Sequence, residues 1–179
     1  MERRQKIYDR IFAGTIDSKL EYAEKLFRQL HPLLLNDDVF TKSFLDLQDN
    51  AVHLSLHMKK MAIGKHCIHC ATSENGGCCS LAMANETDAI QLLVNKLAGI
   101  SVEKVRSDGR ECCFLTEKGC LFTFKPMFCL NYNCGRIMDA ASSNELDLLS
   151  HLSGNILRQQ YCVENHILLT ISQNASLNP

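Results

Sequence analysis

Nine of the ten cysteines in this 179-residue chain lie between Cys67 and Cys134, and Cys162 alone lies outside that stretch. The stretch reads HCIHCATSENGGCCS, continues through a segment of helical pattern, and ends in ECCFLTEKGCLFTFKPMFCLNYNC. In a chain whose start shows no secretory signal, such a density of thiols favours a metal over a set of disulfides. We therefore expect a metal-binding centre that is carried by helical scaffold on both sides.

The charge balance and the hydropathy pattern argue against two classes of partner. The net charge of −1 provides no field that would attract nucleic acid or an anionic membrane surface. The first residues, MERRQKIYDRIF, are charged and amphipathic, unlike a signal peptide, and the apolar runs are far shorter than a membrane span. We expect a cytoplasmic protein, in which thiols stay reduced. Its partner would be an unknown protein or small molecule, with no nucleic acid and no membrane.

Periodic apolar residues predict three helices ahead of the cysteines. The first is predicted over 3–13 and the second over 15–31, because Pro32 removes a hydrogen-bond donor and should end or kink the helix there. The third should begin after Asn36, a good N-cap, and end at Gly64. The apolar positions of the second and third helices are spaced by 4 and 3 residues: Ile16, Leu20, Ala23, Phe27, Leu30 and Leu34, then Phe40, Phe44, Leu47, Ala51, Leu54, Met58 and Met61.

The pattern changes period around the second group of cysteines. A helix is predicted over 86–98, with Gly99 as its stop signal. The apolar and cysteine residues of 112–124 are interrupted by the turn sequence Glu-Lys-Gly, which predicts a small β-hairpin. Pro126, at the first helical position, should open a short helix that carries Cys129 and Cys134.

A long helix is predicted for the end of the chain. Ser142 and Glu145 match a capping box, and apolar periodicity continues to about residue 172. The whole therefore predicts a mainly α fold: a helical bundle with a cysteine-rich metal-binding insertion that contains a small β-hairpin. We expect residues 1–179 to form a single domain, with the cysteine-cluster segment at 65–135.

The spacing of the cysteines suits metal coordination. Thiolates are soft ligands, and four of them suit Zn²⁺ or an iron–sulfur cluster. Cys67 and Cys70 form a CxxC pair that would supply two ligands from one tight turn. The turn sequence Asn75-Gly76-Gly77 should reverse the chain before Cys78 and Cys79, and Gly119 should do the same before Cys120.

The order CxxC…CC, then Cys-x-Phe-Leu, Gly-Cys, Lys-Pro-x-x-Cys and a final Cys, resembles the YkgJ-type cysteine-cluster family, described as zinc- or iron-chelating. The resemblance covers residues 67–134. Lys125 and Leu130 depart from it, because the family usually has arginine at both positions, and the gap between Cys70 and Cys78 is longer than usual. The resemblance implies eight metal ligands: Cys67, Cys70, Cys78, Cys79, Cys112, Cys120, Cys129 and Cys134.

Two cysteines are left over. Cys113 would point away from Cys112 if both lie on a strand, because neighbouring strand residues face opposite sides. The family position before x-Phe-Leu favours Cys112 as the ligand. Cys162 belongs to the last predicted helix, where we expect it to fill the core.

Ligand type alone does not choose the metal. Aromatic residues close to the cysteines could exclude water from an iron–sulfur cluster, which slightly favours iron–sulfur over zinc. We expect a metal-binding protein with a redox or structural role. Two alternatives remain: a group-transfer enzyme related to the cluster proteins of the flagellin lysine N-methylase type, and an interaction adaptor whose loops are folded by zinc.

Histidines offer weaker candidates for a site. His66 and His69 interleave with the CxxC cysteines and could replace a thiolate, although we expect them to be loop residues or outer hydrogen-bond donors. Asp49, His53 and His57 are spaced by 4 residues along the third predicted helix. Such a stripe could contribute to a site in a bundle, but a solvated polar face is the simpler expectation.

Overall fold

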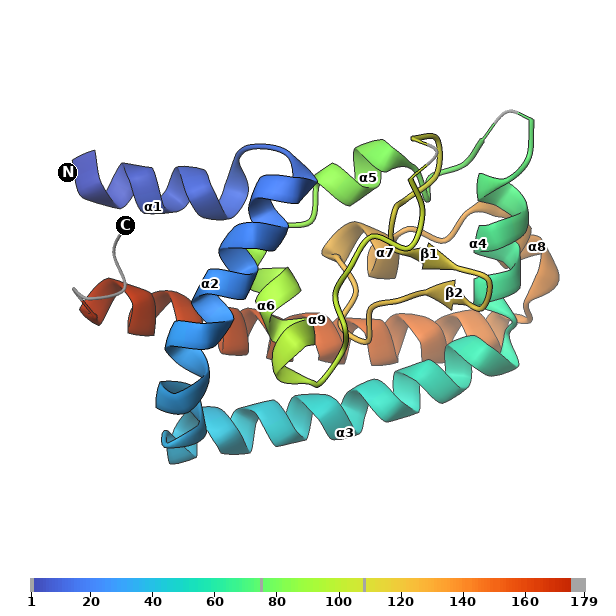
Figure 1. The fold of residues 1–179 in the computed structure, drawn as a ribbon. Coiled ribbons are helices and arrows are strands. Elements are labelled where there is room, and N and C mark those ends of the chain that lie inside the picture. Colours follow the sequence, from blue (N-terminus) through green and yellow to red (C-terminus); the bar gives the residue numbers. More distant parts are fainter. Residues whose placement is uncertain (1, 75, 108, 175–179) are drawn as a thin grey trace.

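The computed structural model describes residues 2–74, 76–107 and 109–174 of a mainly helical chain with one small antiparallel hairpin (Figure 1). The mainly α prediction is therefore confirmed. The elements, in chain order, are α1 (Glu2–Phe12), α2 (Ile16–Leu35), α3 (Asp38–Lys60), α4 (Ile63–Ala71), α5 (Leu81–Asn85), α6 (Ala89–Leu97), β1 (Leu115–Thr116), β2 (Gly119–Cys120), α7 (Met127–Asn131), α8 (Gly135–Ala140) and α9 (Ser143–Gln173).

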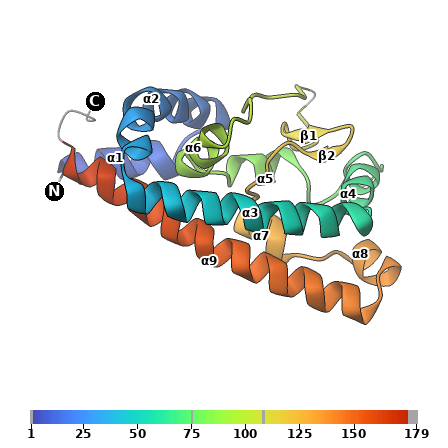
Figure 2. The same ribbon diagram turned by 90° about the horizontal axis from the view of Figure 1, so that it is seen from below.

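The long helices α3 and α9 lie side by side along most of their length (Figure 2). Each contributes one apolar stripe, as the 4 and 3 spacing predicts. The predicted capping box at the start of α9 is present: the Ser142 hydroxyl accepts from the Glu145 backbone N–H, and the Glu145 carboxylate accepts from the Ser142 N–H. The stripes consist of Phe40, Phe44, Leu47, Ala51 and Leu54 on α3, and of Leu149, Ile156, Val163, Ile167 and Ile171 on α9.

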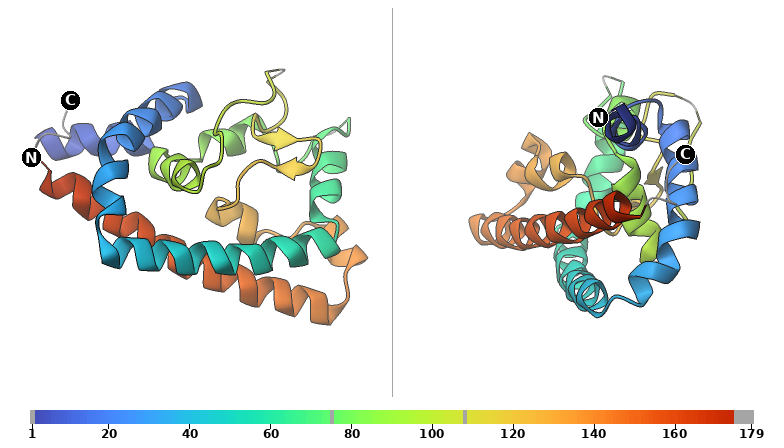
Figure 3. Two further views of the ribbon diagram at one scale, coloured as in Figure 1. Left: turned by 60° about the horizontal axis from the view of Figure 1, so that its bottom comes forward. Right: turned by 90° about the vertical axis from the view of Figure 1, so that its left-hand side faces the viewer.

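Helix α2 crosses the α3–α9 pair at the end where α3 begins, and it packs against α6 (Figure 3). Helix α6 is buried from Ala89 to Asn95, because α2, α1 and α9 all contact it. The predicted stop at Gly99 holds, since its φ of +79° is one that glycine adopts easily. One continuous core of buried residues runs from Ile11 on α1 to Ile171 on α9.

The boundary between α2 and α3 differs from the prediction. Helix α2 continues through Pro32 to Leu35, so it does not end near residue 31. Pro32 is exposed and lies in the last turn, so the one backbone bond that it cannot donate, to the Arg28 carbonyl, is lost close to the end of the helix. Asn36 is not the N-cap of α3; its side chain donates to the Pro32 carbonyl, and the Asp37 carboxylate accepts from the Phe40 N–H instead.

Helix α3 also ends earlier than predicted. The chain turns at Ala62, whose φ of +52° is left-handed, and Gly64 lies inside the next helix, α4. Gly64 is needed for packing: a Cβ there would come within 2.7 Å of the Lys118 carbonyl oxygen in the hairpin turn. The glycine thus joins α4 to the hairpin, which the local sequence pattern does not reveal.

The hairpin is present but shorter than predicted. Leu115 pairs with Cys120 and Thr116 with Gly119, so the strands cover only part of 112–124. After it, Pro126 is the N-cap of α7 rather than its first helical residue. Helix α7 ends at Asn131, so Cys134 does not share it with Cys129 but caps α8.

Helices α4 and α8 and the hairpin lie toward the end of the α3–α9 pair where α9 begins, α7 lies nearer its middle, and α1 lies toward the other end (Figure 3). Among the described helices, none is both long and apolar enough to cross a membrane.

Candidate metal centre

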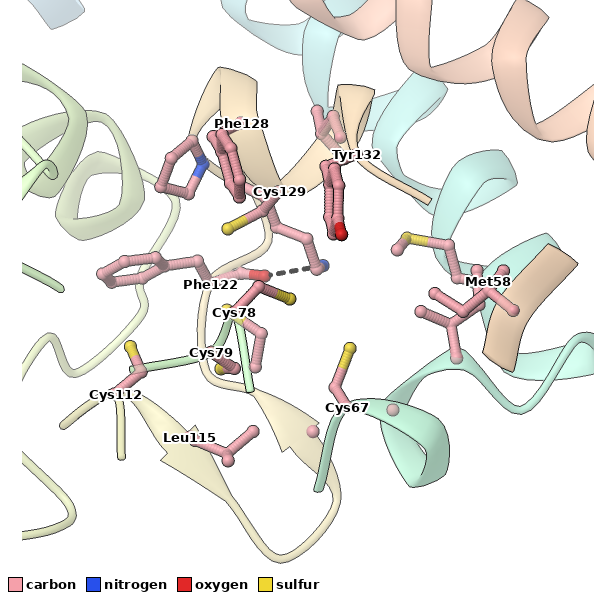
Figure 4. A pocket seen from close by; sticks show the side chains of 18 of the residues that line it. Met58, Cys67, Cys78, Cys79, Cys112, Leu115, Phe122, Phe128, Cys129 and Tyr132 are labelled. Carbon is pink, nitrogen blue, oxygen red and sulfur yellow. Dashed lines mark hydrogen bonds between the residues drawn. The ribbon is translucent and has the colours of Figure 1, made fainter. Parts of the chain in front are cut away.

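All eight cysteines that the family resemblance implies as ligands line one cavity of about 350 Å³ (Figure 4). They come from α4, from the loop before α5, from the segment around the hairpin, and from α7 and the start of α8. We call this space the thiol cavity. Its lining includes Cys67, Cys70, Cys78, Cys79, Cys112, Cys120, Cys129 and Cys134.

Cys67 and Cys70 reach the cavity from a helix, not from the tight turn that the sequence predicts. Residues three apart lie on the same face of an α-helix, so both thiols of α4 can line one wall. The side chain of Ser73 donates to the carbonyl oxygen of Cys70 over 2.7 Å and secures the end of the helix. Asn75, which the sequence places in the following turn, lies outside the described residues.

Backbone pairing holds the Cys78–Cys79 segment against the segment before the hairpin. The Cys112 N–H donates to the Cys79 carbonyl over 3.0 Å, and Ser80 forms an antiparallel bridge with Glu111. Glu111 is in turn paired with Arg106, whose side chain also donates to the Leu115 carbonyl. These contacts fix two cysteine-bearing loops that have little regular structure of their own.

The loop between the hairpin and α7 is anchored to two buried side chains of α6. Asn95 accepts from the Phe124 N–H over 3.0 Å and donates to the Phe124 carbonyl over 2.8 Å. Gln91 donates to the same carbonyl. The Lys125 ammonium donates to the Phe122 carbonyl, the bond drawn as a dashed line in Figure 4. Because this loop joins Cys120 to Cys129, its anchoring fixes both thiols.

Burial keeps isolated thiols of the cavity in their neutral form. It raises the pKa of Cys67 to about 11 and that of Cys129 to about 12, and neighbouring thiols add smaller contributions. Cys129 is exposed as a whole residue, but part of its exposed surface lines the cavity. Burial also raises the pKa of Cys78 and of Cys120, which the Lys125 charge opposes at Cys120. A bound cation would reverse this preference, because it stabilises thiolates directly.

Cys79 and Cys112 form a hydrogen-bonded pair. Their shared hydrogen bond lowers the pKa of Cys112 to about 7, while the same bond, followed by burial, raises the pKa of Cys79. The two thiols therefore titrate as one coupled pair, in which Cys112 loses its proton before Cys79 does.

The two remaining cysteines do not line the thiol cavity. Cys113 is buried, and its carbonyl accepts from the Val105 N–H. It lies in a turn, so the strand argument for separating it from Cys112 is wrong, although the two thiols do separate. Cys162 is exposed rather than core filler, because the buried face of α9 passes through Gln160 and Val163 on either side of it.

The candidate histidines differ in location and in burial. His66 and His69 lie on α4, not in a loop, and neither lines the cavity. His53 is exposed, as a solvated stripe predicts. His57 is not solvated: it is buried, and its Nε2 donates to the Glu145 carbonyl over 2.8 Å, at the start of α9. Asp49, the first member of the stripe, is exposed.

Sequence reasoning did not find the apolar half of the thiol cavity. Helices α3 and α9 contribute side chains such as Met58 and Leu149 to it. The aromatic neighbours that the sequence did predict include Phe128 and Tyr132, which lie on the side of Cys129 and stack on each other at 5.2 Å between ring centroids (Figure 4). The buried Ser153 hydroxyl also lines this half and has no hydrogen-bond partner among the described residues. The residues from α3 and α9 belong to helical stripes, and nothing in their spacing distinguishes them from core positions.

The donor chemistry of the cavity fits a thiophilic metal, since its polar lining is dominated by sulfur. Within the described ranges, no three Cys, His, Asp or Glu side chains are grouped closely enough to hold a metal ion. The sulfurs lie on the walls, so coordination requires side-chain rotation toward a common point. No family model matches the chain, and neither does any curated protein or solved structure.

Proposed function

We propose that this protein binds metal through the eight cysteines of the thiol cavity, as iron–sulfur clusters or as zinc, for a redox or structural role. One observation carries the proposal: eight cysteines from separate segments line one cavity, whereas Cys113 and Cys162 do not. The resemblance to YkgJ-type cysteine-cluster proteins supports the same set. Apolar packing alone does not explain why eight thiols should line one cavity.

The apolar lining favours iron–sulfur over zinc. Phe122, Phe128 and Tyr132 lie beside the sulfurs and would limit the access of water to a cluster (Figure 4). Lys125 would offset part of the negative charge of a thiolate-bound centre near Cys120. The protein's own residues would thus hold the metal, exclude water and balance charge, while the metal supplies electron transfer or rigidity.

The test is metal analysis and a visible spectrum of protein purified without oxygen. We expect iron with acid-labile sulfide and a broad brown absorption, or else zinc without colour. Cys70→Ala or Cys129→Ala should lower the metal content, whereas Cys113→Ala with Cys162→Ala should leave it unchanged. A wild-type protein without either metal, or equal losses from Cys113→Ala and Cys70→Ala, would contradict the proposal.

A second candidate function is group transfer on a small molecule bound beside the metal. The apolar half of the thiol cavity, with the unpartnered Ser153 hydroxyl, favours it over an adaptor that is merely folded by zinc. Binding of a methyl donor or a nucleotide to the metal-loaded protein would support this enzyme function. Absence of binding would leave the redox or structural role.

A further inference from the structure

We infer that the thiol cavity holds two separate four-thiolate centres. The inference rests on the proposed metal-binding function and divides its ligands. The first set is Cys67, Cys70, Cys78 and Cys134. The second set is Cys79, Cys112, Cys120 and Cys129.

The first set gathers around α4. Cys67 and Cys70 share a face of this helix, and Gly77 packs so closely on it that a Cβ there would lie 2.6 Å from the Cys70 sulfur. This contact brings the next residue, Cys78, to the same wall. Cys134 caps the N-terminus of α8, and α8 packs against α4. The backbone segments that carry these four cysteines thus lie close together, and the four side chains would have to rotate to meet at one metal.

The second set gathers around the hairpin. Cys79 and Cys112 are joined by their side-chain hydrogen bond and by the backbone bond of 3.0 Å. Cys120 pairs with Leu115, which lies three residues after Cys112. The anchored loop then leads from Cys120 to Cys129. In Figure 4, Cys112 and Cys67 lie on opposite sides of the cavity, and the neighbours Cys78 and Cys79 lie between them.

The division separates two cysteines that are adjacent in sequence. Cys78 would serve the first centre, because it follows Gly77, the glycine that packs on Cys70. Cys79 would serve the second centre, because its backbone carbonyl accepts a hydrogen bond from the Cys112 N–H. A single metal or cluster would have no use for all eight sulfurs, since zinc and common clusters each take four protein ligands. The adjacent pair therefore provides the sharpest test.

The experiment measures metal per chain in wild type and in matched double variants, each loaded without oxygen with Zn²⁺ alone. Wild type should bind two zinc ions. Cys78→Ser with Cys134→Ser should retain one, because both changes fall in the first set. Cys79→Ser with Cys134→Ser should retain none, because one ligand of each set is lost. These two double variants differ only in which of the neighbouring residues, Cys78 or Cys79, is replaced.

The reciprocal variants guard against misfolding. Cys79→Ser with Cys129→Ser should retain one zinc ion, and Cys113→Ser with Cys162→Ser should retain two; circular dichroism checks the helices of each. Retention of one ion by the cross-set variant, loss of all metal from both within-set variants, or one zinc in wild type would overturn the division. A wild type that binds no metal would instead overturn the proposed function.

Discussion

At the scale of single residues, Gly77 packs closely on a proposed ligand, Cys70. A Cβ at this position would lie 2.6 Å from the Cys70 sulfur and 3.0 Å from its carbonyl carbon, so the backbone must move as well. We expect Gly77→Ala to lower the metal content of the first centre without affecting the second. Gly154→Ala is the control, because nothing lies within 4 Å of its Cβ. As an exposed helix position, it should gain up to about 1 kcal/mol of stability. Equal metal content in the two variants would show that Cys70 is not a ligand.

Glu164 on α9 should make stability depend on pH. Burial, and then the charge of Asp88, raise its pKa to about 7, whereas an unfolded glutamate titrates near 4.3. Between these values the unfolded chain loses a proton that the folded protein keeps, so the free energy of unfolding falls as pH rises from about 4 to about 7. Glu164→Gln removes this loss. Urea unfolding should find the variant more stable relative to wild type at pH 8 than at pH 5, whereas exposed Glu21→Gln should show no such difference. A pH-independent difference for Glu164→Gln would contradict the expectation.

The sequence identified eight residues of the candidate site but not what surrounds them. Cysteine spacing and a family resemblance select the eight thiols, because both depend on order along the chain. Ser153 and Leu149 could not be found this way, since they approach the thiols only when α9 packs beside α3. The same limit explains why the burial of His57 was not predicted, since its partner is the Glu145 carbonyl on another helix. It also explains why the exposure of Cys162 was not predicted, since this depends on how α9 is rotated about its axis.

At the scale of elements, apolar periodicity predicted α2, α3, α6 and α9, because each has a continuous stripe that must be buried. Element boundaries were less predictable. Helix α4 was missed: its cysteines indicated a turn, and its order depends on Gly64 packing against the hairpin. Helix α5 has only five residues, too few for a period to be recognised.

Asn95 connects an element of the core to the thiol cavity. Its side chain satisfies both the N–H and the carbonyl of Phe124 in a buried environment. Asn95→Ala leaves the Phe124 N–H without that acceptor, which should cost about 2–3 kcal/mol of unfolding free energy. Metal loss should also accelerate, because the loop carries Cys120 and leads to Cys129. Asn165→Ala, which removes only a bond to Tyr161 within α9, should change stability by less than about 0.5 kcal/mol. Chemical denaturation and metal-release kinetics measure both effects, and equal costs would contradict the anchoring role.

At the scale of the whole molecule, the helical core and the thiol cavity differ in what stabilises them. The core buries apolar stripes of α2, α3, α6 and α9 against one another. Around the cavity, residues 99–114 have no helix or paired strand in their described part beyond the bridge at Glu111. Sequence periodicity can predict the first kind of structure. It cannot predict the second, whose order depends on long-range contacts and, in our proposal, on metal.

Removal of the metal should therefore loosen one part of the protein and leave the other folded. Metal binding contributes folding energy where the chain has too few apolar contacts to order itself. After chelation, we expect trypsin to cut first at the basic residues of the cavity loops, Lys104, Arg106 and Lys118. Arg158 is exposed on α9 and serves as an internal control, because its helix is held by the core and should resist cleavage. Mass spectrometry of the early fragments identifies the cuts, and circular dichroism should retain most of the helical signal. If the loops stay protected after the metal is gone, the cysteines are packing residues, and the proposal that metal orders this segment is wrong.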